Sequence, residues 1–324
     1  MPSSSTFKPA WWLPGPHLQT LFPFIARRFG HRPPLRRERL ELADGDFIDL
    51  DWTVTPADGP IVLILHGLEG SSRSGYARGL LQAVSDRGWR GVVMHFRGCS
   101  GEPNRLPRSY CAGETDDIAT VVGLLRRREP KVPIVAVGYS LGGNALLKWL
   151  GESGADNPLT AAVAVSVPLL LARSAWRMNR GLSRLYQGYL LRSLKASYRR
   201  KMSMAGQLPV PAAELDRLNS FYTFDDRITA PLHGYRDADD YYSRASARQY
   251  LIAIMTPTLV LHAADDPFMT KDVVPAPCEL SPAVQFECSH RGGHVGFVTG
   301  ALPWRPQYWL EQRIGRFITD RFEH

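Results

Sequence analysis

Short apolar runs rich in β-branched residues alternate along most of the chain with longer segments of helical periodicity. Continuous apolar runs are typical of parallel strands, because helices cover both faces of a parallel sheet. Strands are predicted at residues 60–65, 91–96, 133–137, 159–167, 257–262 and 283–288, and helices at 76–87, 115–128, 144–152 and about 306–322. This alternation predicts an α/β fold around a mostly parallel central sheet with right-handed crossovers.

The N-terminal strands follow a different pattern. Apolar and polar residues alternate in Arg39-Leu40-Glu41-Leu42 and again from Phe47 to Trp52. Asp44-Gly45 lies between the two stretches and is a strong hairpin signal. We therefore predict antiparallel N-terminal strands at the start of a mixed sheet.

The alternation of strand and helix stops after Pro168 and resumes near residue 251. Residues 168–250 show helical periodicity, many basic residues and many tyrosines, and they contain no apolar run of the earlier kind. We interpret them as a helical cap inserted into a core of residues 35–167 and 251–324.

Residues 1–34 form a proline-rich and aromatic segment. Pro14, Pro16 and Pro23 argue against a regular helix, whereas Trp11 and Trp12 indicate packing against another part of the protein. We predict an arm packed on the core, with an arm that touches a membrane as the alternative.

One predicted helix of the cap carries apolar and basic residues on different sides. Its apolar positions are Leu182, Leu185, Tyr186, Tyr189 and Leu190, and its basic positions are Arg184, Arg192, Lys195 and Arg199. A cap helix with a solvated basic face explains this pattern. An interfacial helix that contacts anionic lipid or positions a lipid substrate also explains it, so both interpretations stay open.

Composition argues against several classes of protein, including nucleic-acid-binding, exported and membrane-spanning ones. The 324 residues are 44% hydrophobic and carry a net charge of +8, but no nucleic-acid-binding pattern accompanies the charge, so we expect no nucleic-acid partner. No export signal opens the chain and no apolar run reaches the roughly 18 residues of a membrane span. Cys99, Cys111, Cys278 and Cys288 lack the spacing of a zinc site or a disulfide framework. We expect a cytoplasmic protein, with contact at the inner face of the membrane as an extension.

Ser140 lies where a predicted strand meets a predicted helix. The segment Gly138-Tyr139-Ser140-Leu141-Gly142 has the Gly-x-Ser-x-Gly spacing of a nucleophile elbow. Its glycines leave room for a strained turn that exposes the serine hydroxyl at a helix N-terminus, where developing negative charge is favoured. A glycine-rich turn with an N-cap serine has the same pattern, so the spacing alone leaves both interpretations open.

Acidic residues and histidines follow two later strands. Asp265 and Asp266 follow the strand at 257–262, and His290 and His294 follow the strand at 283–288. The order serine, aspartate, histidine is that of the α/β-hydrolase fold, in which the three side chains meet at the carboxyl edge of the sheet. We predict Ser140 as the nucleophile, His294 as the general base and Asp266 as the carboxylate that orients the base.

Turn positions favour one candidate of each type. Asp266 stands directly before a proline, and His294 follows Gly292-Gly293, which permits a tight loop. Asp265 and His290 lack these contexts and stay as the alternatives.

The loop His66-Gly67-Leu68-Glu69-Gly70 follows the strand at 60–65. In α/β-hydrolases this loop supplies one backbone N–H to the oxyanion hole, and the residue after the nucleophile supplies the other. We therefore predict that the amides of Leu68 and Leu141 form the oxyanion hole. His66 is a candidate base, although a histidine in such a loop more often maintains the loop's shape by hydrogen bonds.

Further motifs occur along nearly the whole chain: His17-Leu18-Gln19-Thr20, Arg97 to Asn104, Gly138 to Asn144, Phe224-Asp225-Asp226 through Tyr242, and Gly292 to Phe297. Together they resemble the YheT-like branch of the α/β-hydrolase superfamily, which contains the abhydrolase-domain lipases and the fungal medium-chain acyltransferases. The resemblance implies an esterase or acyltransferase with the triad Ser140, Asp266 and His294. It implies no natural substrate and no role for Phe224-Asp225-Asp226, and the membrane span of the eukaryotic members has no counterpart in this sequence.

These features predict a serine hydrolase that cleaves carboxylic esters, with medium- or long-chain acyl groups, through an acyl-enzyme on Ser140. An acyltransferase that passes the acyl group to an alcohol or lysolipid would use the same triad. Whether hydrolysis or transfer occurs depends on how far the cap excludes water from the active site. A non-catalytic scaffold protein is the third hypothesis. The expected partner is a small-molecule acyl ester, no metal or organic cofactor is required, and the oligomeric state stays open.

Overall fold

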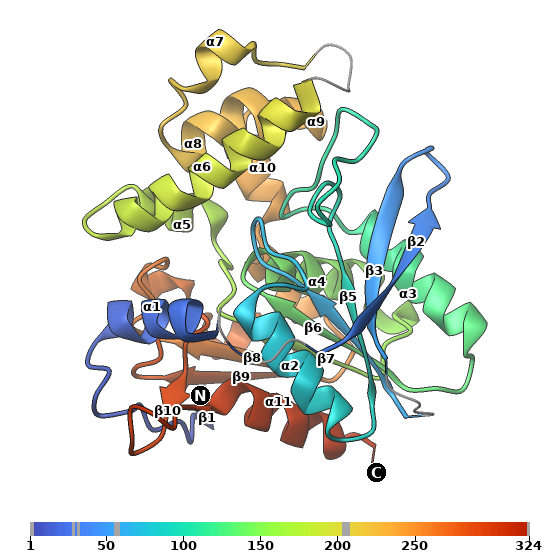
Figure 1. Cartoon of the computed structure of the whole chain (residues 1–324), viewed down its shortest axis with the longest axis vertical. Helices are drawn as coiled ribbons and strands as arrows, with labels where there is room; N and C mark the ends of the chain where they lie inside the picture. The colour runs from blue at the N-terminus through green and yellow to red at the C-terminus, as the bar shows by residue number, and fades with distance from the viewer. Residues whose placement is uncertain (1–2, 28–29, 31–32, 55–58, 203–207, 323–324) are drawn as a thin grey trace.

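The structure is a computed structural model of the chain, and it describes residues 3–27, 30, 33–54, 59–202 and 208–322. Within these residues nine strands form one sheet in the order β1-β9-β8-β7-β6-β4-β5-β3-β2 (Figure 1). The strands are β1 (Ser3–Ser4), β2 (Leu35–Glu41), β3 (Phe47–Thr53), β4 (Ile61–Leu65), β5 (Arg90–Met94), β6 (Ile134–Tyr139), β7 (Ala161–Val165), β8 (Thr258–Ala263) and β9 (Val284–Ser289).

Most neighbouring strands of this sheet run parallel, from β5 through β4, β6, β7 and β8 to β9. The pairs β2–β3 and β3–β5 are antiparallel, and the β2–β3 hairpin turns at Asp44-Gly45. The predicted mostly parallel sheet with antiparallel N-terminal strands is therefore confirmed. The short strand β1, which the sequence did not predict, pairs in parallel with β9.

Helices cover both faces of the sheet (Figure 1), and those of the core are α2 (Gly75–Ser85), α3 (Asp116–Arg128), α4 (Leu141–Ser153) and α11 (Trp309–Thr319). Helices α2 and α11 pack in one apolar cluster with Val62 and Ile64, whereas α3 and α4 pack in another with Leu63 and Leu65. Successive residues of a strand point to opposite faces. A central strand covered on both faces must therefore be apolar throughout, which explains the continuous runs in the sequence.

In the part that the structure describes, the chain between β7 and β8 consists of helices joined by turns and contains no strand (Figure 1). Its elements are α5 (Leu171–Met178), α6 (Ser183–Met202), α7 (Ala212–Leu215), α8 (Phe221–Phe224), η3 (Asp225–Thr229), α9 (Ala230–Leu232), α10 (Ala238–Ala245) and η4 (Ala247–Ala253). The short elements elsewhere are η2 (Gly154–Asp156), η5 (Lys271–Val273), η6 (Pro277–Glu279), β10 (Val298–Thr299) and β11 (Gln307–Tyr308). The helical character predicted for 168–250 is confirmed, whereas the division of the chain into arm, core and cap stays a prediction.

Helix α6 does not bury the apolar positions that its periodicity singled out. Its buried residues are Ser183, Gln187, Leu191, Tyr198 and Lys201. Leu182, Leu185 and Tyr189 are exposed instead. Polar residues turn inward because they find partners: the Ser183 hydroxyl donates to Pro267 O at 2.6 Å, and the side-chain amide of Gln187 donates to Asn179.

The expectation that prolines keep the arm from forming a regular helix was wrong, because Pro16–Ala26 is the helix α1. Pro16 occupies the first turn, where a missing N–H costs nothing. Pro23 lies inside the helix and is buried. The packing of α1 on the rest of the protein offsets the lost helical hydrogen bond, since the buried Gln19 side chain exchanges two hydrogen bonds with the backbone of Val298.

In the part of the chain that the structure describes, no helix combines the length and the apolar content needed to span a lipid bilayer.

Candidate active site

Ser140 lies at a sharp turn between β6 and α4. Its backbone angles are φ 50° and ψ −117°, a conformation that L-residues seldom adopt and that functional sites often contain. The Ser140 amide donates to Val165 O on the neighbouring strand β7 at 2.8 Å, which helps to maintain the strained turn. A Cβ on Gly138 would lie 2.6 Å from Gly142 O, so the predicted need for glycine here is confirmed.

The structure brings the three predicted side chains together at the carboxyl ends of the strands. His294 Nε2 lies 3.1 Å from Ser140 Oγ, and His294 Nδ1 lies 2.8 Å from Asp266 Oδ2. The buried Asp266 carboxylate can only accept, so Nδ1 carries the proton and Nε2 faces the serine as an acceptor. This arrangement allows His294 to take the proton of Ser140.

The alternative acid and base occupy other places. Asp265 Oδ1 accepts a hydrogen bond from the amide of Gly293 at 3.0 Å and thereby supports the histidine loop. Burial raises the pKa of Asp265. His290 is exposed and lies at the surface of the protein. Neither residue contacts Ser140 or His294 by a side-chain hydrogen bond among the described residues.

His66 is buried and maintains the backbone around it. Its Nε2 accepts a hydrogen bond from the amide of Phe96, and its Nδ1 lies 2.7 Å from Gly67 O. Burial lowers the pKa of His66 to about 3. Because both ring nitrogens of this neutral imidazole have backbone partners, His66 stabilises the loop and is not placed to act as a base. This agrees with the loop-shaping role that the sequence analysis favoured for it.

Three residues that the sequence analysis did not assign hold the histidine loop in place. Thr20 of α1 accepts a hydrogen bond from the His294 amide, and Ser166 accepts one from the Val295 amide. The ring of Phe268 stacks on the His294 imidazole. Thr20 belongs to the motif His17-Leu18-Gln19-Thr20, which was a signal without an assigned role.

The loop after β4 contains the amide of Leu68, one of the two predicted oxyanion donors. The amides on either side of Leu68 are engaged: Gly67 N donates to the Tyr76 hydroxyl and Glu69 N to the Tyr110 hydroxyl. No acceptor for the Leu68 amide is found among the described residues. Leu68 and Ser140 line the same pocket, so the Leu68 amide stays the predicted oxyanion donor.

Leu141 supplies the other predicted donor. It is the first residue of α4, and the first amides of a helix have no partner within the helix. Its side chain also lines the pocket. Partial positive charge at a helix N-terminus favours an oxyanion at this place.

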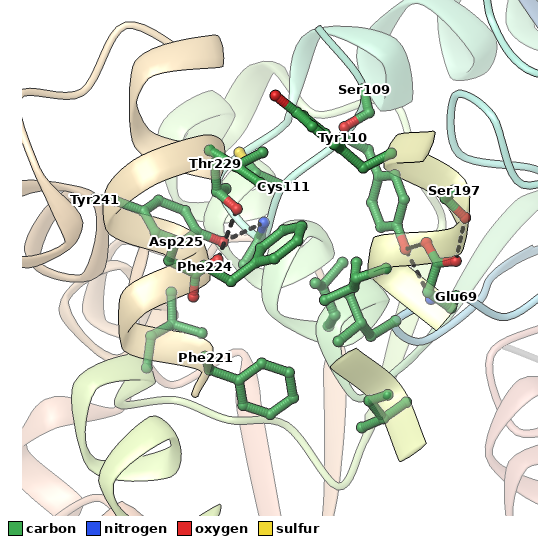
Figure 2. Close-up of a pocket in the computed structure, with 18 of the residues that line it drawn as sticks. Glu69, Ser109, Tyr110, Cys111, Ser197, Phe221, Phe224, Asp225, Thr229 and Tyr241 are labelled. Carbon is green, nitrogen blue, oxygen red and sulfur yellow. Dashed lines mark hydrogen bonds between the residues drawn. The ribbon is translucent and has the colours of Figure 1, made fainter. Parts of the chain in front are cut away.

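A pocket of about 1340 Å³, counted with its opening to solvent, is lined by Ser140 and by residues of α5, α6, α8 and η3. Most of its wall is apolar, including Leu171, Leu190, Leu194 and Phe221. Figure 2 shows two polar groups on opposite sides of this space, one at Asp225 and one at Glu69. The arrangement suits a largely apolar ligand that extends away from the serine.

The Asp225 side faces the pocket from the π-helical turn η3. Asp225 Oδ1 accepts a hydrogen bond from the Thr229 hydroxyl and Oδ2 accepts one from the Tyr242 hydroxyl, each at 2.7 Å. Burial raises the pKa of Asp225 to about 6. Asp226 points elsewhere and accepts from the Ala238 amide at the start of α10. The two acids of the motif therefore have different surroundings, which the sequence alone did not indicate.

The Glu69 side of the pocket joins the loop after β4 to α6. Glu69 Oε2 accepts from the Ser197 hydroxyl at 2.6 Å and Oε1 accepts from the Tyr110 hydroxyl at 3.1 Å (Figure 2). Lys201 lines the pocket nearby and donates to Arg108 O. Burial lowers the pKa of Lys201 to about 8.

Comparisons with known proteins agree with this fold. The family model described as the alpha/beta hydrolase fold matches residues 60–301. The chain is 48% identical to "Putative esterase YheT" of Escherichia coli (strain K12), over 99% of this chain and 95% of that protein. It is 32% identical to "Phospholipase ABHD3" of Mus musculus, over 99% of this chain and 80% of that protein.

A solved esterase, Pf2001 of Pyrococcus furiosus, superposes with a TM-score of 0.56 at 16% identity, over 89% of this chain and 92% of that one. Its likeness concerns the fold alone. The predicted resemblance to the YheT-like branch is confirmed by the long, closely similar alignments. On its sequence and its fold, this chain belongs to the α/β-hydrolase family.

Proposed function

We propose that the protein hydrolyses carboxylic esters through an acyl-enzyme on Ser140. One observation carries the proposal: hydrogen-bond distances link Ser140 Oγ to His294 and His294 to Asp266, and Ser140 lines a largely apolar pocket. A serine beside a base that a carboxylate orients is the arrangement for nucleophilic acyl transfer. Relatives named esterase, lipase and phospholipase support an ester substrate.

Each step has a residue to perform it. As Ser140 Oγ attacks the ester carbonyl, its proton passes to His294 Nε2, and the oxyanion receives hydrogen bonds from the amides of Leu68 and Leu141. His294 then gives the proton to the departing alcohol, leaving the acyl group on Ser140. Water then attacks the acyl carbon as it gives a proton to His294 Nε2; the bond from the acyl carbon to Ser140 Oγ breaks, the acid leaves, and His294 returns the proton to Oγ. Asp266 stabilises the imidazolium in both steps.

The wall of the pocket supports an acyl group of medium or long chain. The lining from α5 and from α6 as far as Leu194 consists mainly of apolar side chains, namely Leu171, Ala175, Met178, Leu190 and Leu194. Each buried methylene contributes about 0.8 kcal/mol of binding, so a longer chain gains affinity until the pocket is filled. We propose lipid-like esters as the substrate class.

The experiment is hydrolysis of p-nitrophenyl esters from acetate to palmitate by the wild-type protein, by Ser140→Ala and by Ser243→Ala. Ser243 is an exposed serine of α10 outside the pocket lining, so the same substitution there is a matched control. We expect Ser140→Ala to lose about 10⁴-fold or more in kcat. Ser243→Ala should keep its activity and its labelling by a fluorophosphonate.

The same assay separates the remaining hypotheses. Formation of a new ester when an alcohol is added would favour acyl transfer over hydrolysis. Full activity in Ser140→Ala would refute the proposed nucleophile. If neither turnover nor labelling occurs in the wild-type protein, the scaffold hypothesis replaces the enzymatic one.

A further inference from the structure

Acidic residues are missing from two long segments of the sequence. Residues 1–37 contain six Lys or Arg and residues 157–213 contain nine, and neither segment contains an Asp or a Glu. These segments therefore carry +15, which leaves −7 for the rest of the chain, whose total is +8. Within these segments α5 and α6 carry eight of the basic residues, whereas α1 contains neither Lys nor Arg and contributes apolar side chains.

The fold places the helices of these segments side by side. His17 of α1 stacks on Tyr186 of α6 and lies within hydrogen-bond distance of its hydroxyl, and Phe24 meets Tyr189 edge to face with ring centroids 5.7 Å apart. Figure 1 shows α1, α5 and α6 along one side of the molecule. Two acid-free segments far apart in the sequence thus form one face.

Large apolar side chains project outward from all three helices of this face, which we call the α1–α6 face. Its exposed residues are Leu18, Leu21, Phe24 and Ile25 of α1, Trp176 of α5, Leu185 and Tyr189 of α6, and Leu182, which directly precedes α6. Leu185 is 72% exposed and Leu182 61%. So many exposed apolar side chains on adjacent helices indicate a binding surface, because soluble proteins seldom leave them together in water.

Unpaired arginines accompany these side chains. Arg184 and Arg192 lie on α6 and form no ion pair among the described residues, and the Arg180 guanidinium lies 3.6 Å over the ring of Trp176. Arginine and tryptophan together suit the headgroup region of a bilayer, where the ring is partly buried and the cation meets phosphate. Each basic residue near an anionic leaflet adds to the attraction.

We propose that the α1–α6 face docks on an anionic lipid bilayer, with Leu182, Leu185 and Tyr189 entering the headgroup region and the arginines meeting lipid phosphates. The charge of this face favours an anionic bilayer over a second copy of the chain as its binding partner. A symmetric dimer through this face would bring the like charges of Arg184 and Arg192 from both copies together, whereas an anionic bilayer supplies phosphates that neutralise them.

The docked face would lie beside the candidate active site. Tyr186 of α6 packs on Phe268, whose ring stacks on His294. Leu190 and Leu194 of the same helix line the pocket. A lipid ester leaving the bilayer along α6 would therefore meet the pocket directly. This delivery role rests on the proposed esterase function, whereas the docking itself rests only on exposure and charge.

The test is co-sedimentation of the full chain with vesicles of phosphatidylglycerol and phosphatidylcholine in equal parts, and with vesicles of phosphatidylcholine alone. All proteins carry Ser140→Ala, so that binding is measured without turnover. The result for membrane docking is then independent of whether the proposed esterase function is correct. Leu185→Glu is compared with Ile252→Glu, which introduces the same charge at an exposed residue of η4, the element packed against α4. Equal thermal unfolding of the variants checks their folding.

We expect binding to the anionic vesicles that weakens as salt rises, and little binding to the neutral ones. Leu185→Glu should weaken binding about tenfold or more, because it replaces an apolar side chain that enters the headgroup region by a charge that the anionic lipid repels, and Ile252→Glu should not. Absence of binding to anionic vesicles at low salt, or equal binding by Leu185→Glu, overturns the proposal. So does sedimentation as a dimer that Leu185→Glu dissociates, since the occupant would then be a second copy.

Discussion

The imidazole of His294 lies flat against the ring of Phe268, with centroids 3.9 Å apart and planes inclined by 12°. Phe268 also donates its backbone N–H to Asp266 Oδ1 at 2.8 Å. One residue thus contacts both the proposed base and its carboxylate. The strand β8 carries Asp266 into this turn, so the base is oriented by the ring and the carboxylate together.

We predict that Phe268→Ala lowers kcat about tenfold to a hundredfold and changes KM less, because a loosened imidazole spends less time aligned with Ser140. Steady-state kinetics on a p-nitrophenyl ester measure this. Tyr186→Phe keeps the ring that packs on Phe268 and removes only the hydroxyl, so its kcat should not change. A fall in stability with unchanged kcat would show that the stack is only structural.

Replacing Asp266 should reduce catalysis far more than replacing its neighbour Asp265. Asp266→Asn removes the negative charge opposite the imidazolium and should reduce kcat about 10⁴-fold, with the fold intact. Asp265→Asn keeps an acceptor for the Gly293 amide and should retain most activity. Single-turnover acylation rates of the two variants compare them directly, and a larger loss in Asp265→Asn would reverse the assignment.

Gly142→Ala should destabilise the protein by about 1–3 kcal/mol and abolish activity, because the new Cβ would lie 2.6 Å from the backbone oxygen of Leu65, which cannot move away. Gly188→Ala is the matched control inside α6, where nothing lies within 4 Å of the added carbon. It should stabilise by about 0.5–1 kcal/mol, since alanine loses less backbone entropy in a helix. Urea denaturation measures both, and equal shifts would contradict the steric argument.

Stability should depend on pH through Asp225. Burial raises the pKa of Asp225 from its ordinary 3.8 to about 6. Between these values the folded state holds a proton that the unfolded state has released, so stability is full below pH 3.8 and decreases as pH rises through 6. Asp225→Asn removes the buried charge and should raise stability at pH 8 by about 1–3 kcal/mol.

Urea midpoints of Asp225→Asn and the wild-type protein at pH 8 and below pH 4 test this, and the gain should vanish at the lower pH. The exposed Asp156→Asn is the control and should give no pH-dependent difference. A constant gain at both pH values would mean that Asn improves packing and that the charge is not responsible.

The sequence predicted those parts of the fold that depend on nearest neighbours in the chain. Apolar runs such as Val62 to Leu65 indicate buried parallel strands whatever their order in the sheet, because both faces of each strand must be covered. The elbow at Ser140 was visible for a similar reason. Gly138 is required by the backbone of the same turn and helix, and the local spacing is itself the signal, although Gly142 is required by the backbone of Leu65 on the neighbouring strand.

The arm and α6 show where local reasoning failed. Pro23 disfavours a helix in isolation, but the contacts of Gln19 with Val298 stabilise α1 from residues far along the chain. Helical periodicity separated the sides of α6 but did not say which side faces inward, and the partners of Ser183 and Gln187 decided it. The helical state of α1 and the buried side of α6 both depend on contacts with segments far away in the sequence, which a local sequence pattern does not reveal.

By itself the sequence determined the mostly parallel sheet, the strained turn at Ser140 and the short set of acids and histidines that can serve it, because propensity, spacing and chain order carry that information. Only the tertiary structure decided that His294 lies within reach of Ser140, that Thr20 and Phe268 support it, and that α1 and α6 share an outward apolar face. Distances between remote segments arise from the packing of the whole sheet and its helices, and no single segment encodes them.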